Sequence, residues 1–230
     1  MTGVQVLPLE GIPEVRPGDD LAGLLCDAVE RAGGLIAGDV LVVAQKVVSK
    51  AEGRVEQADD YAEVILREAR AVRRRRDELI IAETEHGFVC ASAGVDRSNT
   101  PGDGWVVLLP RDPDASAADI RDRLAERFDH APAVIVSDSF GRAWRQGTTD
   151  VALGVAGMRP LLDLRGTRDG RGYELQSTII GVADELAGAA ELVMGKADGV
   201  PAALIRGYSV PAGDGSAREL VMPPERDLFP

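Results

Sequence analysis

The sequence predicts a mixed α/β fold of the α+β kind, in which strands and helices follow one another without strict alternation. Short runs rich in valine and isoleucine are interspersed with longer stretches whose apolar residues recur at helical spacing. The 230 residues, 45% hydrophobic and 28% charged, suffice for one substantial core. No repeat or low-complexity linker divides the chain. We therefore expect one domain over residues 1–230, with the proline-rich residues 221–230 as a peripheral tail; a build of two intertwined subdomains stays open.

The first half of the chain predicts a strand, a helix, a buried strand and a second helix, in that order. Residues 4–9 are a short apolar strand, and the helix that follows has Asp19 as its N-cap and the glycine pair 33–34 as its stop. Residues 38–54 form a buried β-run that ends in polar side chains. Residues 58–76 have the pattern of an amphipathic helix, and their basic C-terminal end suits the helix dipole.

The second half predicts five strands and two helices. Apolar runs bounded by turn residues indicate the strands, which cover residues 87–99, 104–110, 131–139, 150–158 and 202–208. One helix covers residues 112–128 and begins at a proline turn with an Asp or Ser cap. The other covers residues 175–196 and is long and apolar.

The charge balance limits the partners of the protein. Lys plus Arg number 26 and Asp plus Glu number 38, which gives a formal net charge of −12. Such a surface argues against general binding to nucleic acid or to an anionic membrane. It does not exclude an anionic substrate, because a cluster of arginines or a metal ion reverses the field inside a site.

The cysteines and the N-terminus predict a cytoplasmic protein. Cys26 and Cys90 lie in separate apolar segments, so we expect reduced core residues and not a disulfide framework. The first residues have no basic region followed by a long apolar one, and no apolar run reaches the roughly 18 residues that span a bilayer.

Common phosphate-binding loops are missing from the sequence. No window fits G-x-x-x-x-G-K-[ST], and residues 194–198, "MGKAD", lack the Ser or Thr after the lysine. No G-x-G-x-x-G opens a helix after a strand. We therefore expect a fold without a P-loop.

Two strand ends carry oxygen ligands. Asp96 and Asn99 end one predicted strand, and Asp138 and Ser139 end another. Mg²⁺ and Mn²⁺ prefer oxygen ligands, often one or two carboxylates completed by substrate phosphates and water. Together the two ends would form a metal–phosphate site. Aspartate is also a common turn residue, so the alternative that Asp96 and Asp138 only cap turns stays open.

Basic residues and a proline-containing turn are further candidates for contacts to a ligand. Arg142 and Arg145 offer planar forks for phosphate or carboxylate, although surface salt bridges would explain them as well. Lys50 ends another apolar run, as a phosphate counter-charge or as an ordinary solvated lysine. Residues 9–15 hold a proline-fixed turn that would meet a base or ribose, or serve only as a connector.

At these residues the sequence resembles the coenzyme F420-0:γ-glutamyl ligases, and it looks most like the ligase half of the two-domain actinobacterial proteins. The matching segments run in order along nearly the whole chain. They include "LPLEGIPEVRPGDDL", "GDVLVVAQKVVSKAEGR", "AGVDRSN", "LLPRDPDASAADIR", "VIVSDSFGRAWRQGTTDVALGVAG", "GYELQSTIIGVADELA" and "VMGKADGVPAALIRGY".

The resemblance implies GTP-dependent ligation of L-glutamate to coenzyme F420-0, and γ-linked extension of the glutamate tail, through an acyl phosphate. It also implies two divalent ions, Mg²⁺ or Mn²⁺, together with K⁺, and an intertwined homodimer. Two other functions stay open: a metal-dependent nucleotide phosphohydrolase, and a GTP- or deazaflavin-binding module without catalysis.

The resemblance also implies roles for individual residues. The family's metal ligands correspond to Asp96, Asp138 and Ser139, and threonine is usual in place of Ser139. The catalytic residues that the resemblance implies are Asp96, Asp138 and Lys50. Gln45 stands where serine is expected. The nucleotide contacts fall on Ile12, Pro13, Glu14, Val15, Gln45, Lys50, Asn99, Met194, Gly195, Lys196, Ala197, Asp198, Gly199, Val200 and Pro201.

Overall fold

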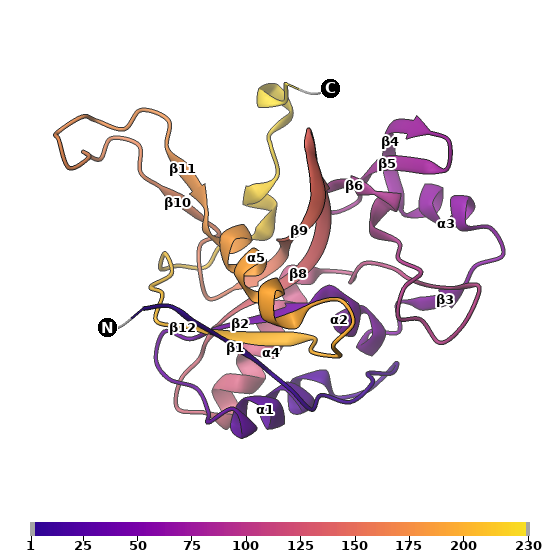
Figure 1. Cartoon of the computed structure of the whole chain (residues 1–230), viewed down its shortest axis with the longest axis horizontal. Coiled ribbons are helices and arrows are strands. Elements are labelled where there is room, and N and C mark those ends of the chain that lie inside the picture. The colour runs from indigo at the N-terminus through magenta and orange to yellow at the C-terminus, as the bar shows by residue number, and fades with distance from the viewer. Residues whose placement is uncertain (1–2, 229–230) are drawn as a thin grey trace.

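A five-stranded mixed sheet forms the centre of the computed structural model, which describes residues 3–228 (Figure 1). Its strands lie in the order β1-β12-β2-β8-β9, and only β2 and β8 run parallel. In that order they are β1 (Gln5–Pro8), β12 (Ala202–Arg206), β2 (Val40–Ala44), β8 (Ala133–Arg142) and β9 (Arg145–Ala156). The mixed α/β class predicted from the sequence is confirmed.

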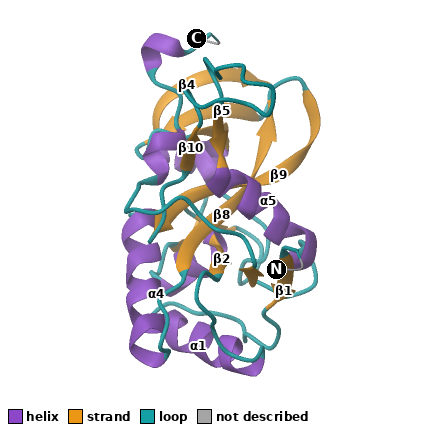
Figure 2. Ribbon diagram, turned by 90° about the vertical axis from the view of Figure 1, so that its left-hand side faces the viewer, coloured by secondary structure: helices purple, strands orange, loops and turns teal. Residues whose placement is uncertain are grey.

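Helices cover both faces of this sheet, as Figure 2 shows. Helices α1 (Leu21–Arg31) and α4 (Pro113–Arg127) pack on the face that carries Leu41 and Val136. Helix α5 (Val182–Met194) packs on the opposite face, against Val42 and Ile135. The inner strands are therefore buried on both sides and have continuous apolar runs, which made them easy to recognise in the sequence.

A smaller unit lies beside β8, at the right of Figure 1. It contains α3 (Tyr61–Glu68), the sheet of β4 (Ala69–Arg76), β5 (Leu79–Thr84) and β6 (Val89–Ala91), and the pair β3 (Val55–Gln57) and β7 (Trp105–Val107). A separate core that includes Ile65, Ile80 and Val106 holds the unit together.

Two ribbons, three short 3₁₀ helices and one further helix, described below, complete residues 3–228. The ribbon of β10 (Leu161–Asp163) and β11 (Ile179–Gly181) projects from the body, and so does the far end of the β8–β9 hairpin (Figure 1). The 3₁₀ helices are η1 (Ser92–Gly94), η2 (Ala217–Leu220) and η3 (Pro224–Arg226). Within residues 3–228, none of the helices combines the length and the apolar character that crossing a bilayer requires.

The predicted strand over residues 38–54 is wrong in its second part. Strand β2 ends at Ala44, and helix α2 (Gln45–Ala51) follows directly. Gln45, Val48 and Ser49 are buried. This i, i+3, i+4 spacing matches one face of a helix and not the two-residue period of a strand.

The predicted helix over residues 58–76 is also too long. It ends at Glu68, and the arginine run lies on the edge strand β4, which pairs with β5 around a turn at Asp77. Edge strands often carry charged side chains because these discourage pairing with other chains. The basic residues are thus part of a sheet edge and do not end a helix.

Other boundaries also differ from the prediction, among them the start of β9 at Arg145 and not at residue 150. Helix α5 begins only at Val182, because residues 179–181 pair with β10 as β11. The N-cap of α1 is Asp20, whose carboxylate accepts the N–H of Gly23 at 3.0 Å, and not Asp19. In the predicted strand 87–99, β6 ends at Ala91. The predicted strands near the two termini and the helix at 112–128 are confirmed.

Candidate active site

A cavity of about 570 Å³ opens where β2 gives way to α2. Its walls come from the 12–15 turn, α2, β8, the end of α5 and the loop after it. Strand β8 pairs with β2 only as far as Ser137, which lies opposite Ala44, and then continues with β9 alone. The edge of β8 from Asp138 onward is therefore left open toward the cavity, whose size is typical of ligand sites.

Asp138 and Ser139 flank this open edge from opposite faces of the ribbon, because side chains alternate along a strand. Both lie inside β8, which continues to Arg142, so the expectation that the strand ends at Ser139 is wrong. Burial, with the nearby carboxylates of Asp96 and Asp150, raises the pKa of Asp138 to about 7, although the backbone N–H of Ser139 and the charge of Lys196 oppose the shift. A cation near Asp138 would relieve this concentration of negative charge.

Asp96 does not itself line the cavity, but it approaches the cavity from the smaller unit and pairs with Lys46 of its wall. Its backbone forms an isolated antiparallel β-bridge with Val107. Its carboxylate accepts the N–H of Ser98 at 2.6 Å and forms an ion pair with the Lys46 amine at 2.9 Å. Burial works to raise the pKa of Asp96, but these hydrogen bonds outweigh it and the net shift is downward. Asp96 is thus held as a carboxylate close enough to perturb Asp138.

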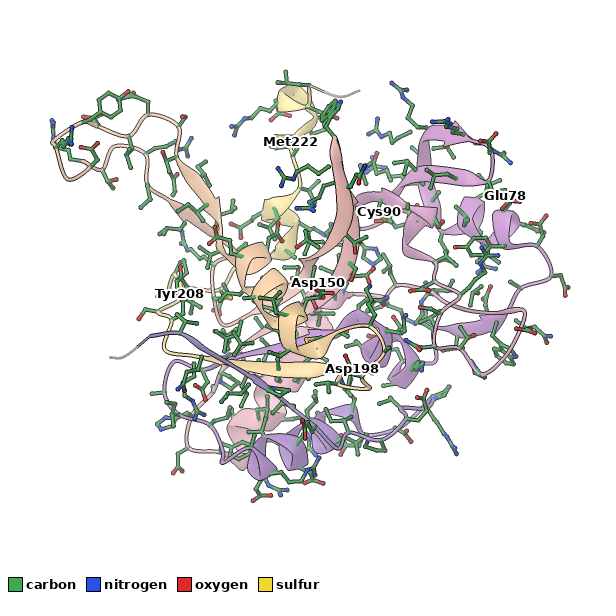
Figure 3. All side chains as sticks on the ribbon, in the orientation of Figure 1. Glu78, Cys90, Asp150, Asp198, Tyr208 and Met222 are labelled. Atoms are coloured by element: carbon green, nitrogen blue, oxygen red, sulfur yellow. The ribbon has the colours of Figure 1, made fainter. Side chains whose placement is uncertain are left out.

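The predicted nucleotide contacts converge on the cavity, with the exception of Asp198. Those that line it are Ile12, Pro13, Glu14, Val15, Gln45, Lys50, Asn99, Met194, Gly195, Lys196, Ala197, Gly199, Val200 and Pro201. Asp198 lies on the loop after α5, as Figure 3 shows. Its carboxylate approaches Gly195, where φ is +58° and a Cβ atom would lie 2.5 Å from Oδ2, so this turn requires glycine.

All three lysines of the chain line this one cavity. Lys50 is 6% exposed and donates to Glu14, Lys46 pairs with Asp96, and Lys196 donates to the Ser139 hydroxyl at 2.5 Å. The other basic residues are arginines and two histidines. The cavity therefore gathers three ammonium groups, which favour an anionic ligand, beside the four carboxyl groups of its lining.

Gln45 carries an unsatisfied donor at the cavity wall. Its Oε1 accepts the Ser49 hydroxyl at 2.9 Å, while its Nε2 is buried and has no hydrogen-bond partner within residues 3–228. A buried amide without a partner costs free energy. An acceptor atom of a bound ligand would remove that cost.

The sequence did not indicate Asp150, Lys46 or Ser137, which also line the cavity. The recognisable signal for Asp150 is the β8–β9 hairpin, in which it lies directly opposite Ser139. Arg142 and Arg145, in contrast, do not line the cavity but lie at the tip of that hairpin, where Arg142 donates to the Gln146 carbonyl at 3.3 Å.

The oxygen ligands are of the kind that suits a hard divalent cation. No group of three or more His, Cys, Asp or Glu residues with metal-site geometry occurs in the described part of the chain. Mg²⁺ commonly uses one or two carboxylates and completes its shell with water and substrate phosphates. Asp96, Asp138 and the Ser139 hydroxyl fit that incomplete type of site.

We expect Asp138 to make the metal-free protein less stable as the pH rises from about 4 to about 7. The folded-state pKa of about 7 exceeds the ordinary 3.8, so folding keeps a proton that the unfolded chain releases. Relative to the unmodified protein, Asp138→Asn should therefore gain up to roughly a few kcal/mol of unfolding free energy across this range. Urea unfolding in EDTA at several pH values measures the difference, and parallel pH profiles would contradict the expectation.

Comparison with known proteins identifies the family. The model of the family described as F420-0:Gamma-glutamyl ligase matches residues 11–207. The chain is 44% identical to the coenzyme F420:L-glutamate ligase of Methanothermobacter thermautotrophicus, over 99% of both chains, and 43% identical to that of Methanopyrus kandleri, over 100% of both. The protein of the same name from Methanocaldococcus jannaschii is 40% identical over 84% of both. The chain therefore belongs to the F420-0:gamma-glutamyl ligase family, and it is a ligase that forms an amide bond.

Proposed function

We propose that this ligase joins L-glutamate to coenzyme F420-0 with GTP as cosubstrate, and that it extends the product by γ-linked glutamates. The observation that carries the proposal is the single cavity that gathers Asp138, Ser139 and all three lysines of the chain. The named activity of the relatives supports the acceptor and the amino acid. The lysines and the unsatisfied Gln45 donor support an anionic nucleotide.

The reaction must first activate a carboxylate, because oxide is too poor a leaving group for an amine to displace. A carboxylate oxygen of the acceptor attacks the γ-phosphorus of GTP, the bond to the β-phosphate oxygen breaks, and GDP leaves. The glutamate amine then attacks the acyl carbon, the acyl–oxygen bond breaks, and phosphate leaves as the amine gives up a proton. GTP, acceptor and glutamate thus become GDP, phosphate and amide.

The residues of the cavity, together with Asp96 beside it, would each serve one part of this reaction. Lys50 would hold the phosphates, and the 12–15 turn, Gln45, Asn99 and the 194–201 loop would hold the nucleotide. Asp96, Asp138 and Ser139 would hold two Mg²⁺ or Mn²⁺ ions, which supply charge stabilisation for phosphoryl transfer. K⁺ stays a prediction without assigned residues.

We expect product only when GTP, a divalent ion, F420-0 and L-glutamate are all present. Each component is omitted in turn, products are read by mass, and excess EDTA should remove activity that added Mn²⁺ restores. Because the phosphorylated acceptor is an intermediate, omission of F420-0 should also stop the release of GDP. ATP in place of GTP tests the nucleotide.

The same experiment distinguishes the alternatives. A nucleotide phosphohydrolase would release phosphate from GTP without F420-0 or glutamate, and a binding module without catalysis would bind GTP and form no product. Unchanged ligation in excess EDTA would overturn the metal part of the proposal, and equal use of ATP would overturn the choice of nucleotide.

We also propose an intertwined homodimer and a cytoplasmic location. The two projecting ribbons support the dimer, because they carry Trp144 and Tyr173, which are 80% and 65% exposed in the single chain. Large aromatic side chains at such positions are typical of surfaces that pack against a partner. Arg142 and Arg145, next to Trp144, remain proposed contacts to a substrate phosphate or carboxylate.

A further inference from the structure

Asp150 is a buried residue whose carboxylate accepts hydrogen bonds from two serine hydroxyls. Only 5% of the residue is exposed, and it lies on β9 opposite Ser139. Its Oδ1 accepts the Ser139 hydroxyl at 2.5 Å, and its Oδ2 accepts the Ser137 hydroxyl at 3.0 Å. Ser137 and Ser139 reach the same carboxylate because residues two apart on a strand share a face. Figure 3 shows Asp150 near the centre of the molecule.

The Asp150 carboxylate has no direct ionic partner in the described part of the chain. Within residues 3–228 no Lys, Arg or His forms an ion pair with it at 4.0 Å or less. Burying a carboxylate costs free energy that two hydroxyl hydrogen bonds offset only in part. The Lys196 amine is linked to Asp150 indirectly. It donates a hydrogen bond to the Ser139 oxygen, and the Ser139 hydroxyl donates in turn to Asp150. The Lys196 charge offsets part of this cost across Ser139, and a divalent cation at the same oxygen would offset more of it.

The Ser139 hydroxyl has one hydrogen and two lone pairs. Its hydrogen is committed to Asp150, so its oxygen can only accept from the cavity side, as the contact with Lys196 illustrates. A hydroxyl that binds a metal ion must do so through a lone pair. Without Asp150 the hydroxyl would be free to rotate and direct its hydrogen at the ion.

We propose that Asp150 is a positioning residue that fixes the Ser139 hydroxyl with its lone pair toward the divalent cation. The inference rests on the proposed function, in which Ser139 is a metal ligand. Carboxylates commonly orient metal ligands in this way, and their hydrogen bonds are strong because the acceptor is charged. Asp150 itself acts through Ser139 and is not assigned to the metal.

The test is a double-mutant cycle on Mn²⁺ affinity, measured by titration with electron paramagnetic resonance at saturating GDP, which supplies phosphate ligands but allows no turnover. Asp150→Asn should weaken Mn²⁺ binding about 10- to 100-fold in the unmodified background. In the Ser139→Ala background the same change should cost less than about twofold, because the group that Asp150 orients is gone. Ser137→Ala is the matched control, since it removes the other hydroxyl from the same carboxylate and should leave Mn²⁺ affinity within about threefold.

Other outcomes decide against the inference. Equal losses from Asp150→Asn in both backgrounds would show that Asp150 acts independently of Ser139, and unchanged affinity would show that it does not act on the metal. Circular dichroism checks that each variant folds, and Asp150→Thr, which suits a strand, replaces Asp150→Asn if that variant does not. If the unmodified protein bound no Mn²⁺, the metal part of the proposed function would fail and this inference with it. Normal Mn²⁺ binding with unaffected variants would overturn the inference alone.

Discussion

Asp138→Asn is expected to lower the rate of ligation about a thousandfold or more while the protein stays folded, because under the proposed mechanism it removes a charged metal ligand from the centre of phosphoryl transfer. The asparagine is nearly the same size, so packing around β8 should not change. The carboxyl group has a pKa of about 7 in the folded chain, which marks its charge as unfavourable there without a cation. The variant should therefore be as stable as the unmodified protein, or more stable, at pH 8 in EDTA.

The measurement is the rate of F420-0 glutamylation at saturating GTP and glutamate, together with thermal unfolding. Asp184→Asn is a matched control, because Asp184 is another partly buried carboxyl with a pKa raised by burial, and it lies outside the cavity on α5. That variant should keep ligation within about threefold, since its carboxamide oxygen can still accept the Ala152 N–H. Ligation by Asp138→Asn at more than a tenth of the unmodified rate would remove Asp138 from the metal role.

The sequence predicted the class of fold and most of the cavity, but for different physical reasons. Inner strands such as β2 and β8 are buried on both faces, so their apolar runs are clear without any knowledge of the neighbours. The residues of the cavity were identified largely through resemblance to a family. Spacing alone left Asp96 and Asp138 open to a simpler role as turn residues, and only the folded chain brings them close enough to affect each other.

What the sequence could not predict depended on pairing between distant segments. The arginine run is strand and not helix because β5 is available to pair with it, and local helical spacing carries no information about that partner. Asp150 was not recognised because its importance comes from its position opposite Ser139, which the register of the hairpin sets. Arg142 and Arg145 looked close to Asp138 along the chain, but an extended strand carries them away from the cavity.

Lys50→Met is expected to reduce kcat/KM for GTP about a hundredfold, mainly through a higher KM, because it removes one of three ammonium groups from the cavity. Lys46 and Lys50 are four residues apart on α2 and so lie on one face of the helix. Lys50 is buried beside Glu14, and methionine would keep most of its apolar stem while leaving that carboxylate unpaired near the phosphates. The loss should therefore combine a missing attraction with a new repulsion.

The lysine content of the chain makes this prediction unusually easy to test. Because all three lysines line the cavity, an amine-directed reagent reports on this site and on the N-terminal amine only, and mass spectrometry separates the positions. GTP with Mn²⁺ should protect the lysines of the unmodified protein and should protect Lys46 and Lys196 of Lys50→Met only at far higher GTP. Glu14→Gln in the Lys50→Met background should recover part of the affinity, since it removes the unpaired carboxylate but restores no attraction. Equal protection of both proteins at the same GTP concentration would mean that Lys50 serves the fold of α2 and does not hold the phosphates.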